Sequence, residues 1–416
     1  MSSVTELKEF SAFLTDQING RPVVIFGKSR GGWYCLKVLR AIGLDVACFS
    51  DKSATAEEVY LGIPVLQHEV ANQKFPAAVW INSLLDRENQ IAASRYLESE
   101  FAINAIQNMP FFLTFFMTIV GNRDVDIGAY HRNWSTYFEG NKESRLLESP
   151  TLSYVLTEKC TLNCDSCGAF VPSIGDPRTF DAKDIVSDIK SYCEAFDIVH
   201  HIALQGGEPF LHKRISEIVA QISKISNLLF VDVVTNGTIS VNDRVLQDMA
   251  KNGTAIWISD YGISSPKADE LTDSCDRLGI YVDRYLYDER EWYAQFPVQK
   301  QNRSESENKK TFTECVADKF QCCQIMDGKI FRCSFSNFTS RLGLIPDFPS
   351  DNADLRSDSP NKHESVRQIA IRKEPLSACD YCLGNERPRV PAGVQTERIK
   401  KSKYRYTEKS LIHVAK

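Results

Sequence analysis

Residues 151 to about 287 alternate between short apolar runs and longer segments in which apolar positions recur at helical spacing. The runs have the length and residue types of buried strands. They lie at 152–156, 201–205, 229–235, 254–259 and 280–286. Between the first two, Ile185, Ile189 and Cys193 share one helical face, and Asp181 is placed to cap that helix. This alternation predicts a parallel sheet with helical crossovers, here a partial (β/α) barrel whose active site lies at the carboxyl ends of the strands.

A second α/β pattern precedes the barrel, with apolar runs at 22–26, 46–49 and 77–81. The first run leads into a glycine turn at 27–32, where a helix amino terminus could hold a phosphate, and Asp51 is placed to meet a ribose or sugar hydroxyl. The order is Rossmann-like, but Ser29 replaces the middle glycine of GxGxxG. The segment also loosely resembles amino-terminal domains of sugar-modifying enzymes, through Gly62 to Val65. A purely structural domain and a nucleotide, nucleotide-sugar or substrate-docking domain both remain open.

These patterns predict an α/β protein with a Rossmann-like amino-terminal domain, a partial barrel and a cysteine-rich carboxyl-terminal module. The expected divisions are a Rossmann-like domain at 1–125, a linker at 126–150, the barrel at 151–290, the module at 310–390 and a tail at 391–416.

The composition limits the binding partners and the cellular compartment that we expect. A formal net charge of -5 gives no general attraction to nucleic acid. No apolar run reaches the roughly 20 residues that span a bilayer, and the longest, 110–120, is predicted to be a buried helix. The first residues lack the pattern of a secretory signal. We therefore expect a cytoplasmic protein that binds neither nucleic acid nor membranes. Disulfides are disfavoured there, so 13 cysteines indicate metal binding or redox chemistry.

The first barrel strand is followed by a CxxxCxxC motif made by Cys160, Cys164 and Cys167. Three thiolates on one loop can bind a [4Fe-4S] cluster and leave one iron without a protein ligand. A zinc or redox loop is the alternative for such a motif taken alone. At these residues the sequence resembles the radical SAM superfamily, over about 151–390. The resemblance implies that the open iron binds S-adenosylmethionine (SAM), which is cleaved reductively to a 5′-deoxyadenosyl radical.

Residues at the next strand ends extend the resemblance. Gly206, Gly207 and Glu208 match the family's GGEP, whose backbone and glutamate region receive the SAM amino group, and glycine lets the main chain approach a ligand closely. The third and fourth strands end at positions where the family contacts the ribose and methionine parts of SAM. The polar residues there are Thr235, Asn236, Ser259 and Asp260. Ser166 departs from the pattern, because an aromatic residue usually stands before the third cysteine, so packing around the adenine is expected to differ.

A second set of cysteines follows the barrel. Cys315, Cys333, Cys379 and Cys382 resemble the ligands of the twitch module, a shorter relative of the SPASM domain that binds an auxiliary [4Fe-4S] cluster. A zinc site made by the same residues is the alternative. Cys322 and Cys323 are left over. Either could replace Cys315 or donate hydrogen to a substrate, and buried packing is the simpler expectation.

The combination of a partial barrel and a twitch module most closely resembles the 2-deoxy-scyllo-inosamine dehydrogenase type of radical SAM enzyme. By analogy, the substrate is a small sugar-like molecule, possibly linked to a nucleotide, that is oxidised or epimerised. A flavodoxin or ferredoxin would supply the electron. Two other functions stay open: a radical SAM enzyme that matures peptides, and a non-catalytic iron-sulfur or zinc protein.

Overall fold

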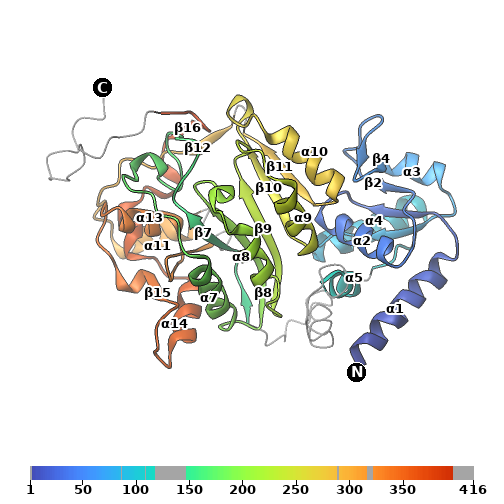
Figure 1. Cartoon of the computed structure of the whole chain (residues 1–416), viewed down its shortest axis with the longest axis horizontal. Coiled ribbons are helices and arrows are strands. Elements are labelled where there is room, and N and C mark those ends of the chain that lie inside the picture. Colours follow the sequence, from blue (N-terminus) through green and yellow to red (C-terminus); the bar gives the residue numbers. More distant parts are fainter. Residues whose placement is uncertain are drawn as a thin grey trace.

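The computed structural model describes residues 2–85, 87–107, 109–117, 147–287, 290–315 and 322–396. The amino-terminal α/β part, the central barrel and the carboxyl-terminal part follow one another along the long axis of the molecule (Figure 1). The predicted fold class is confirmed, because parallel strands joined by helices form both main sheets.

The amino-terminal part is a sheet with helices on its faces. Its elements are α1 (Ser2–Ile18), β1 (Val23–Phe26), α2 (Arg30–Ala41), β2 (Cys48–Ser50), β3 (Val59–Tyr60), β4 (Ile63–Leu66), α3 (His68–Lys74), β5 (Val79–Asn82), α4 (Arg87–Phe101) and α5 (Met109–Phe115). The strand order is β3-β4-β2-β1-β5, and β1 is parallel to both β2 and β5. The predicted helix at 110–120 begins within α5, and its last residues lie outside the described part of the chain.

The barrel contains the five predicted strands in the predicted order. Its elements are β6 (Glu148–Ser149), β7 (Leu152–Thr157), α7 (Ala182–Cys193), β8 (Ile198–Gly206), α8 (Ile215–Ile222), β9 (Leu228–Thr235), α9 (Asp243–Lys251), β10 (Ala255–Asp260), α10 (Ala268–Leu278) and β11 (Val282–Leu286). Asp181 caps α7 by accepting a hydrogen bond from Lys183 N, as the sequence predicted. Strands β7 to β11 are parallel neighbours, so their carboxyl ends lie at one edge.

The carboxyl-terminal part extends the barrel sheet. Its elements are β12 (Glu291–Tyr293), α11 (Glu305–Glu314), β13 (Cys323–Met326), β14 (Lys329–Phe331), α13 (Ser334–Arg341), β15 (Asn352–Asp354), α14 (Lys362–Ala370) and β16 (Arg389–Pro391). Strand β13 pairs in parallel with β7, and the β13–β14 hairpin then continues to β15. One hydrophobic core runs through both parts, from Leu152 in β7 to Ala378. Barrel and carboxyl-terminal part therefore share a sheet and a core.

The amino-terminal part packs against the barrel at the end where its strands begin. Its core is continuous with Ile198, Leu229 and Ala255, which start β8, β9 and β10. Trp33 Nε1 donates a hydrogen bond to Gly279 O over 3.1 Å. The amino-terminal part therefore covers the end of the barrel where the strands begin. The cysteine loop follows the opposite, carboxyl end of β7, so this part does not cover the site.

An ion pair joins the two parts inside this contact. The Arg30 guanidinium binds the carboxylate of Asp232 on β9, and His201 Nε2 lies 2.9 Å from the same carboxylate oxygen. The Asp232 side chain is only 2% exposed. Burial alone would raise the pKa of Asp232, but Arg30 and His201 outweigh it and hold the pKa well below its ordinary value.

Breaking this pair should destabilise the fold. Asp232→Asn is expected to lower the free energy of unfolding at pH 7 by about 3 kcal/mol, because a buried cation loses its partner. A group with a depressed folded-state pKa stabilises above its unfolded pKa, about 3.9 for aspartate, and this contribution fades as pH falls below it. Urea unfolding at several pH values should therefore show the difference from wild type shrinking towards acid.

A surface aspartate provides the control for that measurement. Asp243 pairs with Arg277, and both side chains are more than 60% exposed. Asp243→Asn should change stability by less than about 1 kcal/mol. A wild-type to Asp232→Asn difference that stayed constant between pH 7 and pH 3 would contradict the proposed role of the charge.

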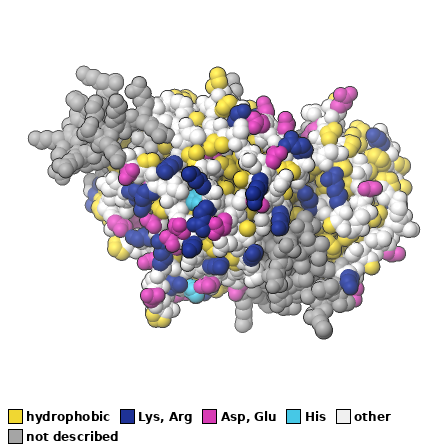
Figure 2. Space-filling view, viewed as in Figure 1, with side chains coloured by type: hydrophobic (Ala, Val, Ile, Leu, Met, Phe, Trp, Pro, Cys, Tyr) yellow, Lys and Arg dark blue, Asp and Glu magenta, His cyan; other side chains and the backbone are white. Residues whose placement is uncertain are grey.

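The surface carries charges of both signs close together. Figure 2 shows Lys and Arg side chains interspersed with Asp and Glu over the barrel and the carboxyl-terminal part on this face. Within the described residues, no helix combines the length and the apolar character needed to cross a bilayer.

Candidate active site

The three cysteines of the CxxxCxxC motif lie on the loop that follows β7. The structure brings them together, since the charges of Cys164 and Cys167 affect the Cys160 thiol and the charge of Cys167 affects the Cys164 thiol. Burial raises the pKa of Cys160 to about 12 and that of Cys164 to about 11. Buried thiolates are stable when a metal compensates their charge. The donor set therefore fits an iron-sulfur cluster bound through thiolates.

Hydrogen-bond donors surround these sulfurs. Leu162 N and Asn236 Nδ2 lie 3.4 and 3.5 Å from Cys160 Sγ, and Gln395 Nε2 lies 3.2 Å from Cys164 Sγ. Donors of this kind favour a thiolate over a neutral thiol. Asn236, predicted to contact SAM, thus reaches the first cysteine and also bonds Thr161 Oγ1 over 3.1 Å.

The two glycines at the carboxyl end of β8 have a steric role at the loop. A Cβ on Gly206 would lie 2.2 Å from Thr157 O, and one on Gly207 would lie 2.1 Å from Lys159 O. Gly207 N donates to Thr157 O over 2.7 Å. From the family resemblance, these glycines were expected to let a ligand approach the main chain. The structure adds a nearer reason, because they let β8 pack directly on the backbone of the cysteine loop.

Glu208 ties two strand ends together. Its fully buried carboxylate accepts hydrogen bonds from Thr235 Oγ1 at 2.9 and 3.0 Å, from Asn236 N at 2.9 Å and from Phe210 N at 3.1 Å. Burial raises the pKa of Glu208 to about 7, against the effect of these donors. The structure thus brings Glu208 and Thr235 together. Hydrogen bonds from Thr235 and Asn236 to the Glu208 carboxylate connect the carboxyl ends of β8 and β9.

The fourth strand ends in residues that also have protein partners. Asp260 Oδ2 lies 2.8 Å from Arg284 Nε, and Asp260 Oδ1 accepts from Gly262 N over 2.8 Å. The Ser259 side chain hydrogen-bonds Tyr261 and Tyr287. Ser166 adopts a positive φ of 53° on the loop itself.

Two residues beside the motif were not predicted from the sequence. Tyr261 lies close enough to Cys164 and Cys167 for their charges to affect its pKa, which burial raises above its ordinary value. Gln395 comes from a segment more than 200 residues further along the chain. A tyrosine after a strand gives a weak signal, and nothing in the sequence around Gln395 marks it as a neighbour of Cys164.

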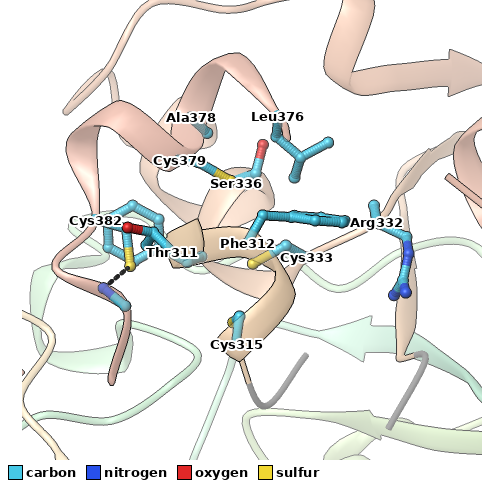
Figure 3. Close-up of a pocket in the computed structure, with 12 residues that line it drawn as sticks. Thr311, Phe312, Cys315, Arg332, Cys333, Ser336, Leu376, Ala378, Cys379 and Cys382 are labelled. Atoms are coloured by element: carbon cyan, nitrogen blue, oxygen red, sulfur yellow. Dashed lines mark hydrogen bonds between the residues drawn. The ribbon is translucent and has the colours of Figure 1, made fainter. Parts of the chain in front are cut away.

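The four cysteines of the second set line one cavity of about 40 Å³ (Figure 3). Cys315 follows α11, Cys333 precedes α13, and Cys379 and Cys382 lie on and beside a short 3-10 helix. Phe312, Phe335 and Leu376 form apolar walls. Cys379 is influenced by the charges of the other three thiols, so the structure brings the predicted set together.

The remaining cysteines of this region do not line this cavity, although the charge of Cys315 affects Cys322 and that of Cys333 affects Cys323. Cys323 is buried in β13 with its Sγ 3.4 Å from Ala370 O, in agreement with a packing role. Cys322 is exposed, so the expectation of buried packing is wrong for this residue. Among the described residues, no three Cys, His, Asp or Glu side chains are grouped as ligands of a single metal ion. Cluster ligands each bind a different iron and lie farther apart than the ligands of one ion.

The glycine turn of the amino-terminal sheet has its polar groups engaged. Lys28 Nζ pairs with Glu58 over 2.5 Å, and Asp51 accepts from Ser53 and Lys28 backbone nitrogens. A Cβ on Gly31 would lie 1.7 Å from Ser83 O, so this glycine is needed for packing of the turn on the chain after β5. With Arg30 bound to Asp232, the geometry favours the structural interpretation of this domain.

Comparisons with known proteins bear on the barrel. Residues 154–265 match the model of the radical SAM superfamily. Molybdenum cofactor biosynthesis protein 1 of Homo sapiens is 36% identical over 109 residues, 25% of this chain and 16% of that protein. GTP 3′,8-cyclase of Aquifex aeolicus (strain VF5) is 26% identical over 143 residues, 33% of this chain and 43% of that protein. The chain thus matches less than half the length of either relative.

Two solved structures are similar at lower levels. The structure of anSMEcpe with bound AdoMet is 12% identical and covers 55% of this chain and 82% of its own, with a TM-score of 0.37. That of BtrN with AdoMet and 2-DOIA is 15% identical and covers 60% and 97%, with a TM-score of 0.34. The family match coincides with the strands that carry the motif cysteines and the polar strand ends. Residues 154–265 therefore form a radical SAM domain, as the cysteine loop and the strand ends predicted.

Proposed function

We propose that this protein is a radical SAM enzyme that abstracts hydrogen from a hydroxyl-bearing carbon of a sugar-like substrate. The observation that carries the proposal is the convergence of Cys160, Cys164 and Cys167 at the carboxyl end of β7, within the segment that matches the family. Reductive cleavage of SAM supplies the 5′-deoxyadenosyl radical for this chemistry. An electron donor of flavodoxin or ferredoxin type is required.

The chain's own residues have distinct roles in this proposal. The motif cysteines bind a [4Fe-4S] cluster through three irons. Glu208 fixes the ends of β8 and β9 through its bonds to Thr235 and Asn236, so the SAM-facing backbone has one geometry. Preorganised polar groups of this kind avoid reorganisation during the reaction. The full predicted set remains the proposed contacts of SAM: Ser166, Gly206, Gly207, Glu208, Thr235, Asn236, Ser259 and Asp260.

The second cysteine set is proposed to bind an auxiliary [4Fe-4S] cluster. Four thiols around one small cavity supply a full set of cluster ligands, and the apolar walls exclude water from it. In an oxidation, such a cluster would accept the electron left on the substrate after hydrogen abstraction. This loss of an electron distinguishes dehydrogenation from epimerisation. In epimerisation the substrate radical instead receives a hydrogen atom.

The relatives suggest a second substrate class with related chemistry. The name GTP 3′,8-cyclase places the reaction of that protein at the 3′ position, which is a ribose carbon bearing a hydroxyl. A ribose in a nucleotide is therefore the alternative to a free sugar or amino-cyclitol. The outcome would then be a redox-neutral cyclisation, for which a lyase or cyclase is the appropriate class.

The proposal is tested by product analysis. The full chain, reconstituted anaerobically with iron and sulfide, should hold about eight irons and form 5′-deoxyadenosine when given SAM and reductant. Candidate sugars and GTP labelled with deuterium at hydroxyl-bearing carbons should transfer the label into 5′-deoxyadenosine. Solvent hydrogen in the product would favour epimerisation. A protein with its full iron content that forms no 5′-deoxyadenosine would refute the enzyme proposal.

A further inference from the structure

Residues 393–396, here called the strap, cross the cysteine loop. Asp165 N donates to Val394 O over 2.6 Å, and Thr396 N donates to Asn163 O over 2.8 Å. Asn163 Nδ2 also donates to Thr396 O over 2.7 Å. The strap forms an isolated antiparallel bridge between Cys164 and Gln395. The first residues of the predicted tail are thus bonded to the motif that carries the chemistry.

Gln395 makes three hydrogen bonds around Cys164. Its Oε1 accepts from Asn163 N over 2.8 Å, and its Nε2 donates to Gly393 O over 2.7 Å and to Cys164 Sγ over 3.2 Å. The first two bonds orient the amide so that an N–H faces the sulfur. Cys164 itself is only 6% exposed, so few water molecules can reach it. The amide is therefore a principal donor to this thiol.

Packing fixes the other end of the strap. A Cβ on Gly393 would lie 2.8 Å from the ring of Tyr261, so the backbone of the strap rests on that ring. Tyr261 follows β10 and contacts Tyr287 and Trp292, with ring centroids 5.1 and 5.5 Å away. The strap is thus positioned by the barrel rim as well as by the loop.

We propose that Gln395 is a positioning residue for the cluster of the proposed function, acting through the Cys164 thiolate. A hydrogen bond to a ligand sulfur stabilises negative charge, and the reduced cluster carries one electron more than the oxidised one. The Gln395 amide therefore raises the reduction potential of the SAM-binding cluster and holds Cys164 in its ligand orientation. This inference rests on the proposed binding of a cluster by the motif cysteines.

Two substitutions separate the donor from the docking contact. Gln395→Glu keeps an oxygen acceptor for Asn163 N and loses the N–H that faces Cys164, whereas Gln395→Leu loses both. Gln395 is exposed, so neither change leaves a cavity in the core. Gln368→Leu is the matched control, because Gln368 is an exposed glutamine on α14 that bonds Glu364.

The measurement is a potentiometric titration of the reconstituted full chain, following the electron paramagnetic resonance signal that changes when SAM is added. Both Gln395 variants should lower the ratio of reduced to oxidised cluster at a fixed potential by about tenfold, equal to 59 mV for one electron. The effect of Gln395→Glu should be at least as large as that of Gln395→Leu, because a carboxylate then faces the thiolate. Gln368→Leu should match wild type.

The outcomes distinguish the inference from its premise. If both variants keep their iron and their wild-type potential, the role of Gln395 is overturned. If only Gln395→Leu shifts the potential, docking of the strap explains the contact and the donor role is overturned. Selective loss of iron from the motif cysteines in both variants would support the positioning role. If the reconstituted wild-type protein shows no paramagnetic resonance signal that changes with SAM, the proposed function itself is refuted.

Discussion

Cys164→Ala is expected to abolish formation of 5′-deoxyadenosine, to below about one thousandth of the wild-type rate. With one of three ligands removed, the motif can no longer hold a cluster with a single open iron. Iron content should fall from about eight to about four, because the second cysteine set lies elsewhere in the fold. Iron analysis and chromatography of the reaction mixture measure both effects.

Cys193→Ala controls for the loss of a buried thiol. Cys193 lies at the end of α7 and packs in the barrel core, away from both cysteine sets. Its replacement should cost some stability and leave the iron content unchanged. Wild-type amounts of 5′-deoxyadenosine from Cys164→Ala would refute the assignment of this cysteine.

Gly207→Ala should disable the cysteine loop without removing any ligand. The added methyl would lie 2.1 Å from Lys159 O and 2.9 Å from Cys160 Cβ, so the backbone of the loop must move. We expect a loss of about half the iron and at least a hundredfold lower 5′-deoxyadenosine formation, since a displacement near 1 Å can cost that much. Iron analysis and product formation are again the measurements.

A glycine on the cysteine loop itself offers a matched control. Gly168 follows Cys167, and a Cβ there would meet no atom within 4 Å. Gly168→Ala should therefore retain its iron and its activity. If Gly207→Ala and Gly168→Ala behaved alike, close packing of β8 on the loop would not be what requires glycine.

The barrel could be predicted from the sequence because its information is local. A buried parallel strand is a continuous apolar run, and the crossover helices show their faces through Ile185 and Ile189 or Ile218 and Ile222. The motif cysteines were predictable for the same reason, since they share one short loop. The second cysteine set required pairing of distant segments, and there the resemblance to a known module supplied what local pattern could not.

Other features depend on contacts that no local pattern encodes. Gln395 meets Cys164 only because the chain returns to the loop after the second cysteine set. The glycine turn at 27–32 was expected to be able to hold a phosphate, yet Arg30 faces Asp232 across the contact between the two parts. The pattern could not reveal that the residues suited to an anion are neutralised by partners far along the chain.

Because β13 pairs with β7, the carboxyl-terminal part is not an independent module that could be removed or transferred by itself. Deleting residues 310–390 would remove β13 from the barrel sheet. The backbone groups of β7 would then be unpaired along one edge, and an exposed edge strand tends to pair with another molecule. Grafting the same residues elsewhere would succeed only on a host offering an equivalent edge strand. A fragment that kept the first cysteine set alone would therefore lose a neighbouring strand of its own sheet.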